Sequence, residues 1–528
     1  MMPINISIDH FIVPRLFFTL ITCCYSYIIF FELLKMGQTL AEKIRQNYVQ
    51  QFSKITEYTA AKPAAEQSVK SQQHLSILHT VEFYHPHTGG AETVVQQISE
   101  RLAKRGHRVE VATTKLPGRD FRELNGVTIH EFDISGNLAH GIRGSDIQRY
   151  KEFLMKQPAD VMMNYAAQQW ATDLAYSVLE PTRGKRVNVI APCGYSALKD
   201  ARTIRWPEFT GYFQKIIPYA VPLYDAAVYH SAVYKDYEFA QLHGFQNSVV
   251  IPNGVDEEEF SAESEIDFRN KYEIKTKYMG LCVGNFFSGK GQDRVIESVR
   301  QMNRGDFTAV LIGKQGDQLD SLKRQAAGLP VKFLVDIPRK DTVAAFHVAD
   351  IFLFGSYIEA SPLVILEAKA SRTPFVSTDC GNVREWKGGI VCSPDEMSEH
   401  VNKLLNNETL RNRLAEEGFN EWKEKLTWDA VVDQYEDLYL RLHHAKKKKK
   451  SVKVPLKLSK KRASKENEEA ALLEKLQKDP RHVPSLVRLA EIEQKRSNHK
   501  KAQKYILAAL ALEPKNRAAK TMWEKLHR

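Results

Sequence analysis

Short apolar runs and longer amphipathic stretches alternate along most of the chain. Residues 75–81 (LSILHTV) form one apolar run, and residues 108–114 (RVEVATT) form the next. The stretch between them places four aliphatic side chains on one face of a helix: Val94, Val95, Ile98 and Leu102. A strand, a helix and a strand in this order are the unit from which parallel β-sheets are built.

The same pattern returns in the second half, where helical stretches separate five apolar runs typical of buried strands. These runs are MGLCVGNF (279–286), FTAVLIG (307–313), VKFLVDI (331–337), DIFLFG (350–355) and PFVSTDC (374–380). A Pro-Asn-Gly turn at 252–254 marks a boundary at about residue 256. The pattern predicts an α/β fold with two Rossmann-like, doubly wound domains facing a ligand-binding cleft.

We expect seven segments along the chain. They are an apolar N-terminal segment (1–36), a polar helix and linker (37–73), two α/β domains (74–256 and 257–427), a helix (428–444), a basic linker (445–468) and a small C-terminal all-α unit (469–528). The last unit resembles a tetratricopeptide repeat, at Leu489 and Ala490 in one helix and at Ala502, Ala509 and Pro514 in and after the next. A unit this small is expected to dock on a protein partner or on the body of the chain.

The N-terminal segment has more than one interpretation. Residues 16–31 are sixteen uncharged, mostly large apolar residues, slightly fewer than the roughly 20 that span a bilayer, and no signal-peptide cleavage site follows. The segment is a membrane anchor, or it is not translated because synthesis begins at Met36; a buried helix is a third interpretation. If it inserts, the basic Lys35, Lys43 and Arg45 after it favour a body on the cytoplasmic side.

The net charge of +11 is concentrated in one tract. Residues 446–465 hold eleven Lys and Arg and no acid, so the rest of the chain is neutral. No aromatic residues alternate with these lysines, so we do not expect nucleic-acid binding, and an anionic membrane surface is the better partner for the tract. The six cysteines form no CxxC pair, which favours a reducing, cytoplasmic location, at the inner face of the cell membrane if the chain associates with it.

Two loops between strands and helices are candidates for phosphate binding. In HPHTGGAET (85–93), Gly89 and Gly90 let the backbone approach a ligand, and free amides at a helix start favour phosphate; a plain turn is the alternative. In GNFFSGKGQD (284–293), Lys290 is placed to reach an anion, although the spacing is not that of a P-loop. No metal is expected at the first loop, because its two histidines lack a third ligand at suitable spacing.

A third loop, YIEASPLVILEAKA (357–370), holds two carboxylates eight residues apart. Ser361 is a good N-cap and Pro362 suits the first helical position, so we expect the helix to begin there and Glu359 to lie in the loop before it. The helix is apolar nearly all round, which predicts burial. Glu367 then either faces a cleft and holds a polar ligand or is salt-bridged at an edge.

Four motifs in order along the chain carry a family resemblance. TGGAE (88–92), PNGVDEEEF (252–260), VGNFFSGKG (283–291) and YIEASPLVILEAKA resemble the retaining nucleotide-sugar glycosyltransferases of family 4 type, also called glycosyl transferases group 1. The resemblance covers roughly residues 75–443. It implies the GT-B fold, with an acceptor domain first, a nucleotide-sugar domain second and a helix at 428–444 that crosses back to the first domain.

The same resemblance implies roles for individual residues. Glu359 lies beside the donor sugar as the catalytic residue, and the other residues bind the donor: Glu367 on the ribose hydroxyls, and Lys290, the amides near Leu363 and Val364, and the loop of Gly89 and Gly90 on the diphosphate. Because a lysine and a helix N-terminus stabilise the charge of the leaving group, we expect no metal or other cofactor besides the nucleoside diphosphate sugar.

Two positions depart from the family pattern. Asn285, a donor-side candidate, stands where many relatives have an arginine that contacts phosphate, and Cys193, an acceptor-side candidate, stands where relatives often have a histidine. Arg202 and Arg205 are nearby basic residues with no spacing argument in favour of either.

Two hypotheses about function follow. The first is an enzyme that moves a hexose from a nucleoside diphosphate sugar to a hydroxyl of a glycan or glycolipid, as in the synthesis of cell-envelope polysaccharides, with retention of configuration. The second is a catalytically weak or inactive scaffold of the same fold that acts through its C-terminal repeat. The departures at Asn285 and Cys193 motivate the second hypothesis.

Overall fold

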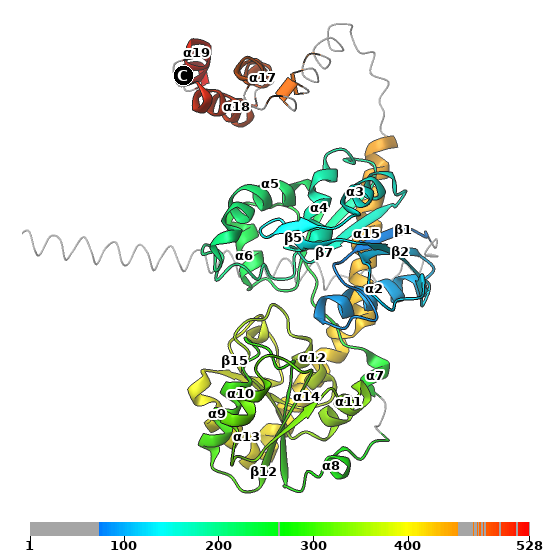
Figure 1. Ribbon diagram of the computed structural model, residues 1–528, viewed down its shortest axis with the longest axis vertical. Coiled ribbons are helices and arrows are strands. Elements are labelled where there is room, and N and C mark those ends of the chain that lie inside the picture. Colours follow the sequence, from blue (N-terminus) through cyan, green and yellow to red (C-terminus); the bar gives the residue numbers. More distant parts are fainter. Residues whose placement is uncertain are drawn as a thin grey trace, which may run out of the picture. The chain divides into compact units, whose positions relative to one another are not determined.

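The structure is a computed structural model, and it describes residues 73–261, 265–451, 482–495, 498–513 and 516–526, together with 468, 472–473, 475–476 and 479. The predictions for residues 1–36, for 37–72 and for most of the basic tract therefore lie outside the described residues. The elements are labelled in Figure 1.

The first domain is built on an eight-stranded sheet with the order β10-β9-β8-β7-β1-β2-β4-β3. Neighbouring strands are parallel except β3 and β4, which are antiparallel. The strands are β1 (Ser76–Thr80), β2 (Arg108–Thr114), β3 (Glu123–Leu124), β4 (Val127–Phe132), β7 (Val161–Tyr165), β8 (Val187–Ala191), β9 (Ala226–Tyr229) and β10 (Ser248–Val250), and β5 (Ser135–Asn137) with β6 (Gly141–Arg143) forms a separate hairpin. The helices are α2 (Gly90–Lys104), α3 (Ile147–Lys156), α4 (Trp170–Leu179), α5 (Ile217–Ala220) and α6 (Lys235–Leu242).

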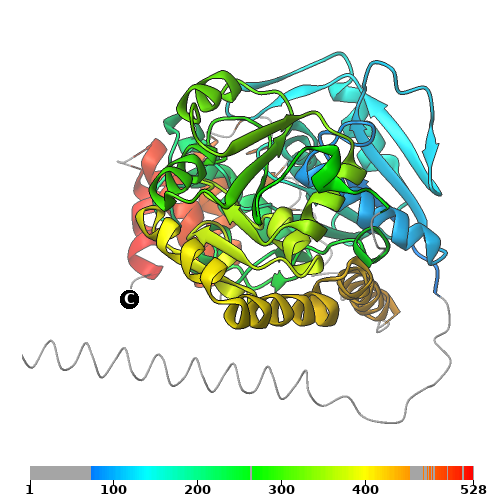
Figure 2. The same cartoon turned by 90° about the horizontal axis from the view of Figure 1, so that it is seen from below.

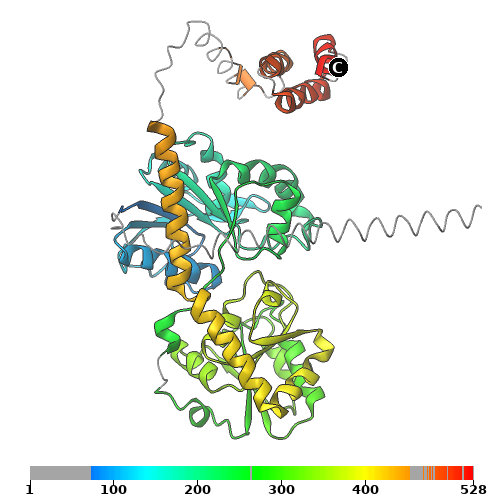
Figure 3. The same cartoon turned by 180° about the vertical axis from the view of Figure 1, so that it is seen from behind.

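Both faces of this sheet are buried, which explains why its central strands are apolar throughout rather than alternating. Leu78 of β1 belongs to the core on one face, whereas its neighbour Ile77 belongs to the core on the other. The long helix α15 (Trp428–Ser451) completes the second of these cores with Trp428 and Tyr439 among other residues. It runs along the outside of the first domain (Figure 3), as expected for a helix that returns to it.

Helix α15 extends past residue 444, the end that the sequence predicts. It continues to Ser451, and the Lys446 ammonium lies 2.5 Å from the Asp225 carboxylate of the first domain. The first turn of the basic tract is therefore anchored by an ion pair, which charge counting alone does not reveal.

The second domain has a six-stranded, fully parallel sheet with the order β13-β12-β11-β14-β15-β16. The strands are β11 (Tyr278–Val283), β12 (Phe307–Gly313), β13 (Val331–Val335), β14 (Ile351–Phe354), β15 (Phe375–Thr378) and β16 (Gly389–Cys392). Helices lie on both sides of the sheet (Figure 2) and enclose two separate cores. They are α7 (Glu257–Ser261), α8 (Phe268–Lys271), α9 (Gln292–Met302), α10 (Leu319–Gln325), α11 (Arg339–Val348), α12 (Leu363–Ala370), α13 (Met397–Asn406) and α14 (Glu408–Glu421). The predicted α/β fold of two doubly wound domains is confirmed.

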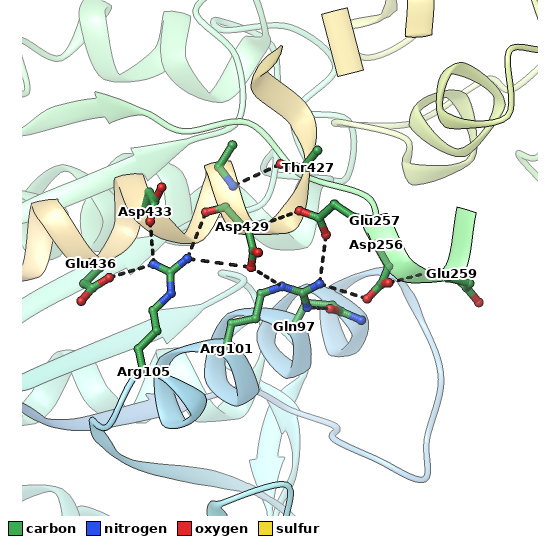
Figure 4. Close-up of polar contacts among 11 residues, drawn as sticks. Gln97, Arg101, Arg105, Asp256, Glu257, Glu259, Thr427, Asp429, Asp433 and Glu436 are labelled. Carbon is green, nitrogen blue, oxygen red and sulfur yellow. Dashed lines mark hydrogen bonds and ion pairs between the residues drawn. The ribbon is translucent and has the colours of Figure 1, made fainter. Parts of the chain in front are cut away.

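Two chain segments connect the domains, and they are hydrogen-bonded to each other. The Val255 amide donates to the Leu426 carbonyl (2.9 Å), and the Trp428 amide donates to the Val255 carbonyl (3.2 Å). Arg101 of α2 and Arg105, the residue directly after this helix, contact carboxylates on these segments (Figure 4). The connection between the domains is thus a built junction rather than a free linker.

The C-terminal helices α17 (Val483–Lys495), α18 (His499–Leu512) and α19 (Arg517–Leu526) enclose a small core of their own. Leu489, Ala490, Ala502 and Ala509 are fully buried, while Pro514 lies outside the described residues. The likeness to a tetratricopeptide repeat stays a prediction.

Candidate active site

Lys290 and Glu359 meet at the carboxyl ends of β11 and β14. The Lys290 ammonium lies 2.8 Å from Glu359 Oε1, and the Ser356 hydroxyl donates to the same oxygen at 3.2 Å. The loop before α9 packs closely against the end of β14 at Gly291. Only glycine fits there, because a Cβ on Gly291 would lie 1.9 Å from the Gly355 carbonyl oxygen. The structure therefore brings Lys290 and Glu359 together, although they are 69 positions apart in the sequence.

Helix α12 begins one residue later than the sequence predicts. Its N-cap position is Pro362, extended at φ −70° and ψ 117°, and Leu363 and Val364 supply the first helical amides. The expectation that Ser361 caps the helix is wrong, because its hydroxyl accepts a hydrogen bond from the Asn382 amide (3.4 Å) instead. As first residues of the helix, Leu363 and Val364 have amides without a partner inside the helix.

Glu367 lies on α12 and is 8% exposed. Its Oε1 accepts from Arg339 at 2.6 Å, while its Oε2 is buried and has no hydrogen-bond partner among the described residues. Arg339 in turn holds both carboxylate oxygens of Glu259 at 2.8 Å. One oxygen of Glu367 is thus in a salt bridge, and the interpretation that this residue holds a polar ligand stays a prediction.

The loop with Gly89 and Gly90 forms the start of α2. Gly89 is extended, at φ −156°, and the Thr93 hydroxyl donates to its carbonyl at 2.8 Å. A Cβ on Gly89 would lie 2.4 Å from a Glu92 carboxylate oxygen, whereas a Cβ on Gly90 would point into open space. Glu92 also lies 3.4 Å from the His87 ring nitrogen Nδ1. Gly90 rather than Gly89 therefore gives a ligand room to approach.

Cys193 lies beside a buried histidine. Its sulfur is 3.6 Å from Nε2 of His230, which also lies 3.0 Å from the Tyr165 hydroxyl. Burial raises the pKa of the Cys193 thiol to about 12 and lowers the pKa of His230. This shift favours the protonated thiol, which is less reactive than a thiolate.

Gly194, the next residue, lies close to Ala360 of the second domain. Its backbone lies at φ +93°, and a Cβ there would be 2.4 Å from the Cβ of Ala360. Gly194 therefore borders the loop of Glu359, while Arg202 is exposed in the loop that follows, and the acceptor-side role of Cys193 stays a prediction.

Asn285 is close to the donor-side groups. Its Oδ1 accepts from the backbone amide of Lys314 at 3.2 Å, and its own carbonyl accepts from the Gln292 side chain. Sequence reasoning missed both Lys314 and Arg339. The glycine before Lys314, directly after a buried strand, was a usable signal for the first, but nothing in the sequence pairs Arg339 with Glu367.

Comparison with known proteins agrees with this geometry. The family model "Glycosyltransferase Family 4" matches residues 88–259, and "Glycosyl transferases group 1" matches residues 264–421. Sucrose-phosphate synthase from Thermosynechococcus elongatus aligns over 70% of this chain and 100% of its own, with a TM-score of 0.56 and 17% identity. The structure of Anabaena HepE in complex with UDP and glucose aligns over 69% of this chain and 99% of its own, with a TM-score of 0.55 and 18% identity. The chain is an enzyme of the glycosyltransferase class with the GT-B fold.

Curated relatives extend over most of the same region. N-acetyl-alpha-D-glucosaminyl L-malate synthase of Bacillus anthracis is 21% identical over 371 residues, which are 67% of this chain and 94% of the relative. O-antigen chain mannosyltransferase C of Escherichia coli is 24% identical over 393 residues, 70% and 100% of the two chains. These relatives carry both domains, and they favour the enzyme over the scaffold.

Two other features are absent from the part of the chain that the structure describes. None of its helices is long and apolar enough to cross a membrane. The same residues contain no group of three or more His, Cys, Asp and Glu side chains placed to hold a metal ion.

Proposed function

We propose that the protein moves a sugar from a nucleoside diphosphate donor to a hydroxyl group of a glycan or glycolipid and retains the anomeric configuration. The observation that carries the proposal is the buried carboxylate of Glu367, one oxygen of which has no hydrogen-bond partner among the residues that the structure describes. A buried polar oxygen left unpaired costs free energy, and two ribose hydroxyls are suitable donors for it. Glu367 therefore binds the ribose in this proposal.

The remaining roles follow from the positions of the groups along α12. The start of α12 and Lys290 bind the diphosphate, since helix amides and an ammonium both attract phosphate. In this proposal Glu359, which lies 2.8 Å from Lys290, contacts the sugar of the donor. Gly90, with open space around it, lets the first domain approach the donor from the other side.

The transfer step keeps its atoms and charges in balance. The bond between the anomeric carbon and the diphosphate oxygen breaks, and the nucleoside diphosphate leaves with the electron pair. The acceptor oxygen forms its bond on the same face, and its proton goes to the departing phosphate oxygen. Lys290 and the helix amides stabilise the charge that develops on the leaving group. In this proposal the nucleotide sugar is the only small molecule needed and no metal takes part.

The names of relatives guide the choice of acceptor. The Escherichia coli relative is named for the O-antigen chain, and the Bacillus anthracis relative for L-malate. We therefore propose a cell-envelope polysaccharide or similar acceptor, reached at the inner face of the membrane through the basic tract. A protein partner at the C-terminal helices belongs to the same proposal.

The test is a binding screen with UDP, GDP, ADP and their sugars. A ligand that binds only the native state raises the melting temperature, so one nucleoside diphosphate should stabilise the protein. Glu367→Ala should abolish this shift, while Glu416→Ala, an exposed glutamate on α14, should leave it unchanged. Absence of any shift with the wild-type protein would contradict the proposal.

A further inference from the structure

We infer that Lys314 is a diphosphate-binding residue of this enzyme, additional to Lys290. The inference rests on the proposed function, because it takes the donor to be a nucleoside diphosphate sugar. It is carried by the place of Lys314 in the fold, by the direction of its side chain and by the charges of the cations around it.

Lys314 follows β12 in the same way that Asn285 follows β11. These strands are parallel neighbours, so their carboxyl ends lie side by side. The loops after them touch through their backbones: a Cβ on Gly313 would lie 2.2 Å from the Gly284 carbonyl oxygen, and one on Gly316 would lie 2.1 Å from that of Phe286. Glycines at both places allow this contact, and the Lys314 amide then donates to Asn285 Oδ1 at 3.2 Å.

The Lys314 side chain extends toward the first domain. Its ammonium lies 2.5 Å from the hydroxyl of Thr88, the residue directly before Gly89 and Gly90. It therefore reaches the start of α2, a helix of 15 residues whose N-terminal amides favour an anion. The space over Gly90 is open, because an added Cβ would contact no atom within 4 Å.

Charge distinguishes Lys314 from the other cations on this edge of the second domain. Lys290 shares its charge with Glu359, and Arg339 is held between Glu259 and Glu367. Arg294 donates to the Gly355 carbonyl and stacks on the Tyr357 ring. Among the described residues, Lys314 forms no ion pair and its ammonium contacts only a neutral hydroxyl.

A departing nucleoside diphosphate carries more negative charge than one lysine already paired with a glutamate can balance. An ammonium without a carboxylate partner is therefore the group most available to it. Because position 285 adjoins the Lys314 backbone, an arginine placed there would bring a cation to the same phosphate. Asn285→Arg should therefore restore the diphosphate binding that is lost in Lys314→Ala.

The experiment measures binding of UDP, GDP and ADP, and of the matching monophosphate and nucleoside, by calorimetry with the full chain. Four variants are compared with wild type: Lys314→Ala, Lys314→Arg, Lys314→Ala combined with Asn285→Arg, and Lys323→Ala as an exposed lysine on α10 with the same loss of charge. Melting curves without ligand check that each variant folds.

We expect Lys314→Ala to weaken the binding of the nucleoside diphosphate by about 10-fold, which is the effect of one lost charge-assisted contact. The affinity for the nucleoside should not change. Lys314→Arg and the double variant should bind within about threefold of wild type, and Lys323→Ala should match it. Diphosphate affinity that is unaltered in Lys314→Ala overturns the inference while the proposed function stands. Equal losses for nucleoside and diphosphate overturn it as well. If wild type binds none of the three diphosphates, the proposed function fails and the inference fails with it.

Discussion

At the scale of single residues, Gly194 shows how closely the acceptor-side loop is fitted to the loop of Glu359. Its positive φ of +93° is a conformation that side chains other than glycine adopt with strain. Its Cα also faces Ala360, with no room for a methyl group between them. Two independent reasons therefore require glycine at this position.

Gly194→Ala should separate these two reasons when it is compared with Gly184→Ala. Gly184 also has a positive φ, +77°, but an added Cβ would meet nothing within 4 Å. Both variants should lose about 1 to 2 kcal/mol of unfolding free energy from backbone strain. Only Gly194→Ala should also lose transferase activity, because its methyl group displaces the loop of Glu359. Urea denaturation and donor turnover are the measurements, and equal activity of the two variants would contradict the close fit.

The buried carboxylate of Asp236 supports the same loop by accepting from the Gly194 amide at 2.9 Å. Burial raises its pKa from 3.8 to about 6, against the effect of its hydrogen bonds from backbone amides. Because the folded pKa lies above the unfolded value, the stability that the protonated group contributes is fully present below pH 3.8. It is lost as pH rises through 6.

Asp236→Asn should remove this pH dependence and keep an oxygen acceptor for Gly194. Relative to wild type, the variant should gain stability between pH 4 and pH 7, by an amount on the order of 3 kcal/mol from a shift of about two pKa units. The difference between the two unfolding free energies, measured by urea denaturation at each pH, isolates this one group. If the difference in unfolding free energy between Asp236→Asn and wild type does not change with pH, burial does not raise the pKa of Asp236.

At the scale of elements, α2 is tied to both segments that connect the domains. Arg101, whose side chain is 16% exposed, contacts Asp256 (3.0 Å) and Glu257 (3.1 Å) on one segment and Asp429 (3.1 Å) at the start of α15 (Figure 4). Glu257 also accepts from the Asp429 amide at 2.8 Å. The helix that begins at Gly90 is thus fixed to the junction of the domains near its C-terminal end.

Arg105 provides a matched comparison, because it is similarly buried but contacts α15 alone, at the Asp429 carbonyl (3.2 Å), Asp433 (2.9 Å) and Glu436 (2.7 Å). Arg101→Ala and Arg105→Ala should each cost about 1 to 2 kcal/mol of stability, since each leaves carboxylates without their partner. Only Arg101→Ala should speed amide hydrogen exchange at residues 256–260, because only Arg101 holds that segment. Equal exchange in both variants would mean that Arg101 does not fix the junction.

At the scale of the whole molecule, much of the fold and part of the site were predictable from local patterns. Fully buried parallel strands are apolar throughout, so β11 and β14 are visible in the sequence, and the spacing of Glu359 and Glu367 places one in a loop and the other on a helix. The roles of these two residues and of Lys290, Gly89 and Gly90 stay predictions that binding and turnover must test.

The rest could not be predicted because it depends on contacts between distant parts of the chain. Ser361 is a good N-cap by local rules, yet Asn382 engages its hydroxyl from the next loop. Arg339 at the start of α11 forms an ion pair with Glu367 of α12, and Lys314 contacts Thr88, which is 226 positions away. Local propensity carries no information about such pairs, since only the folded topology brings them together.

The central claim is that this enzyme transfers a sugar from a nucleoside diphosphate and retains its configuration. Proton NMR of the reaction, with the donor chosen by the binding screen and a glycan or glycolipid acceptor, measures it most directly. The account predicts a product whose anomeric proton shows the same configuration as the donor, formed together with one nucleoside diphosphate per transfer. A product of inverted configuration, or release of free sugar without transfer, would contradict it.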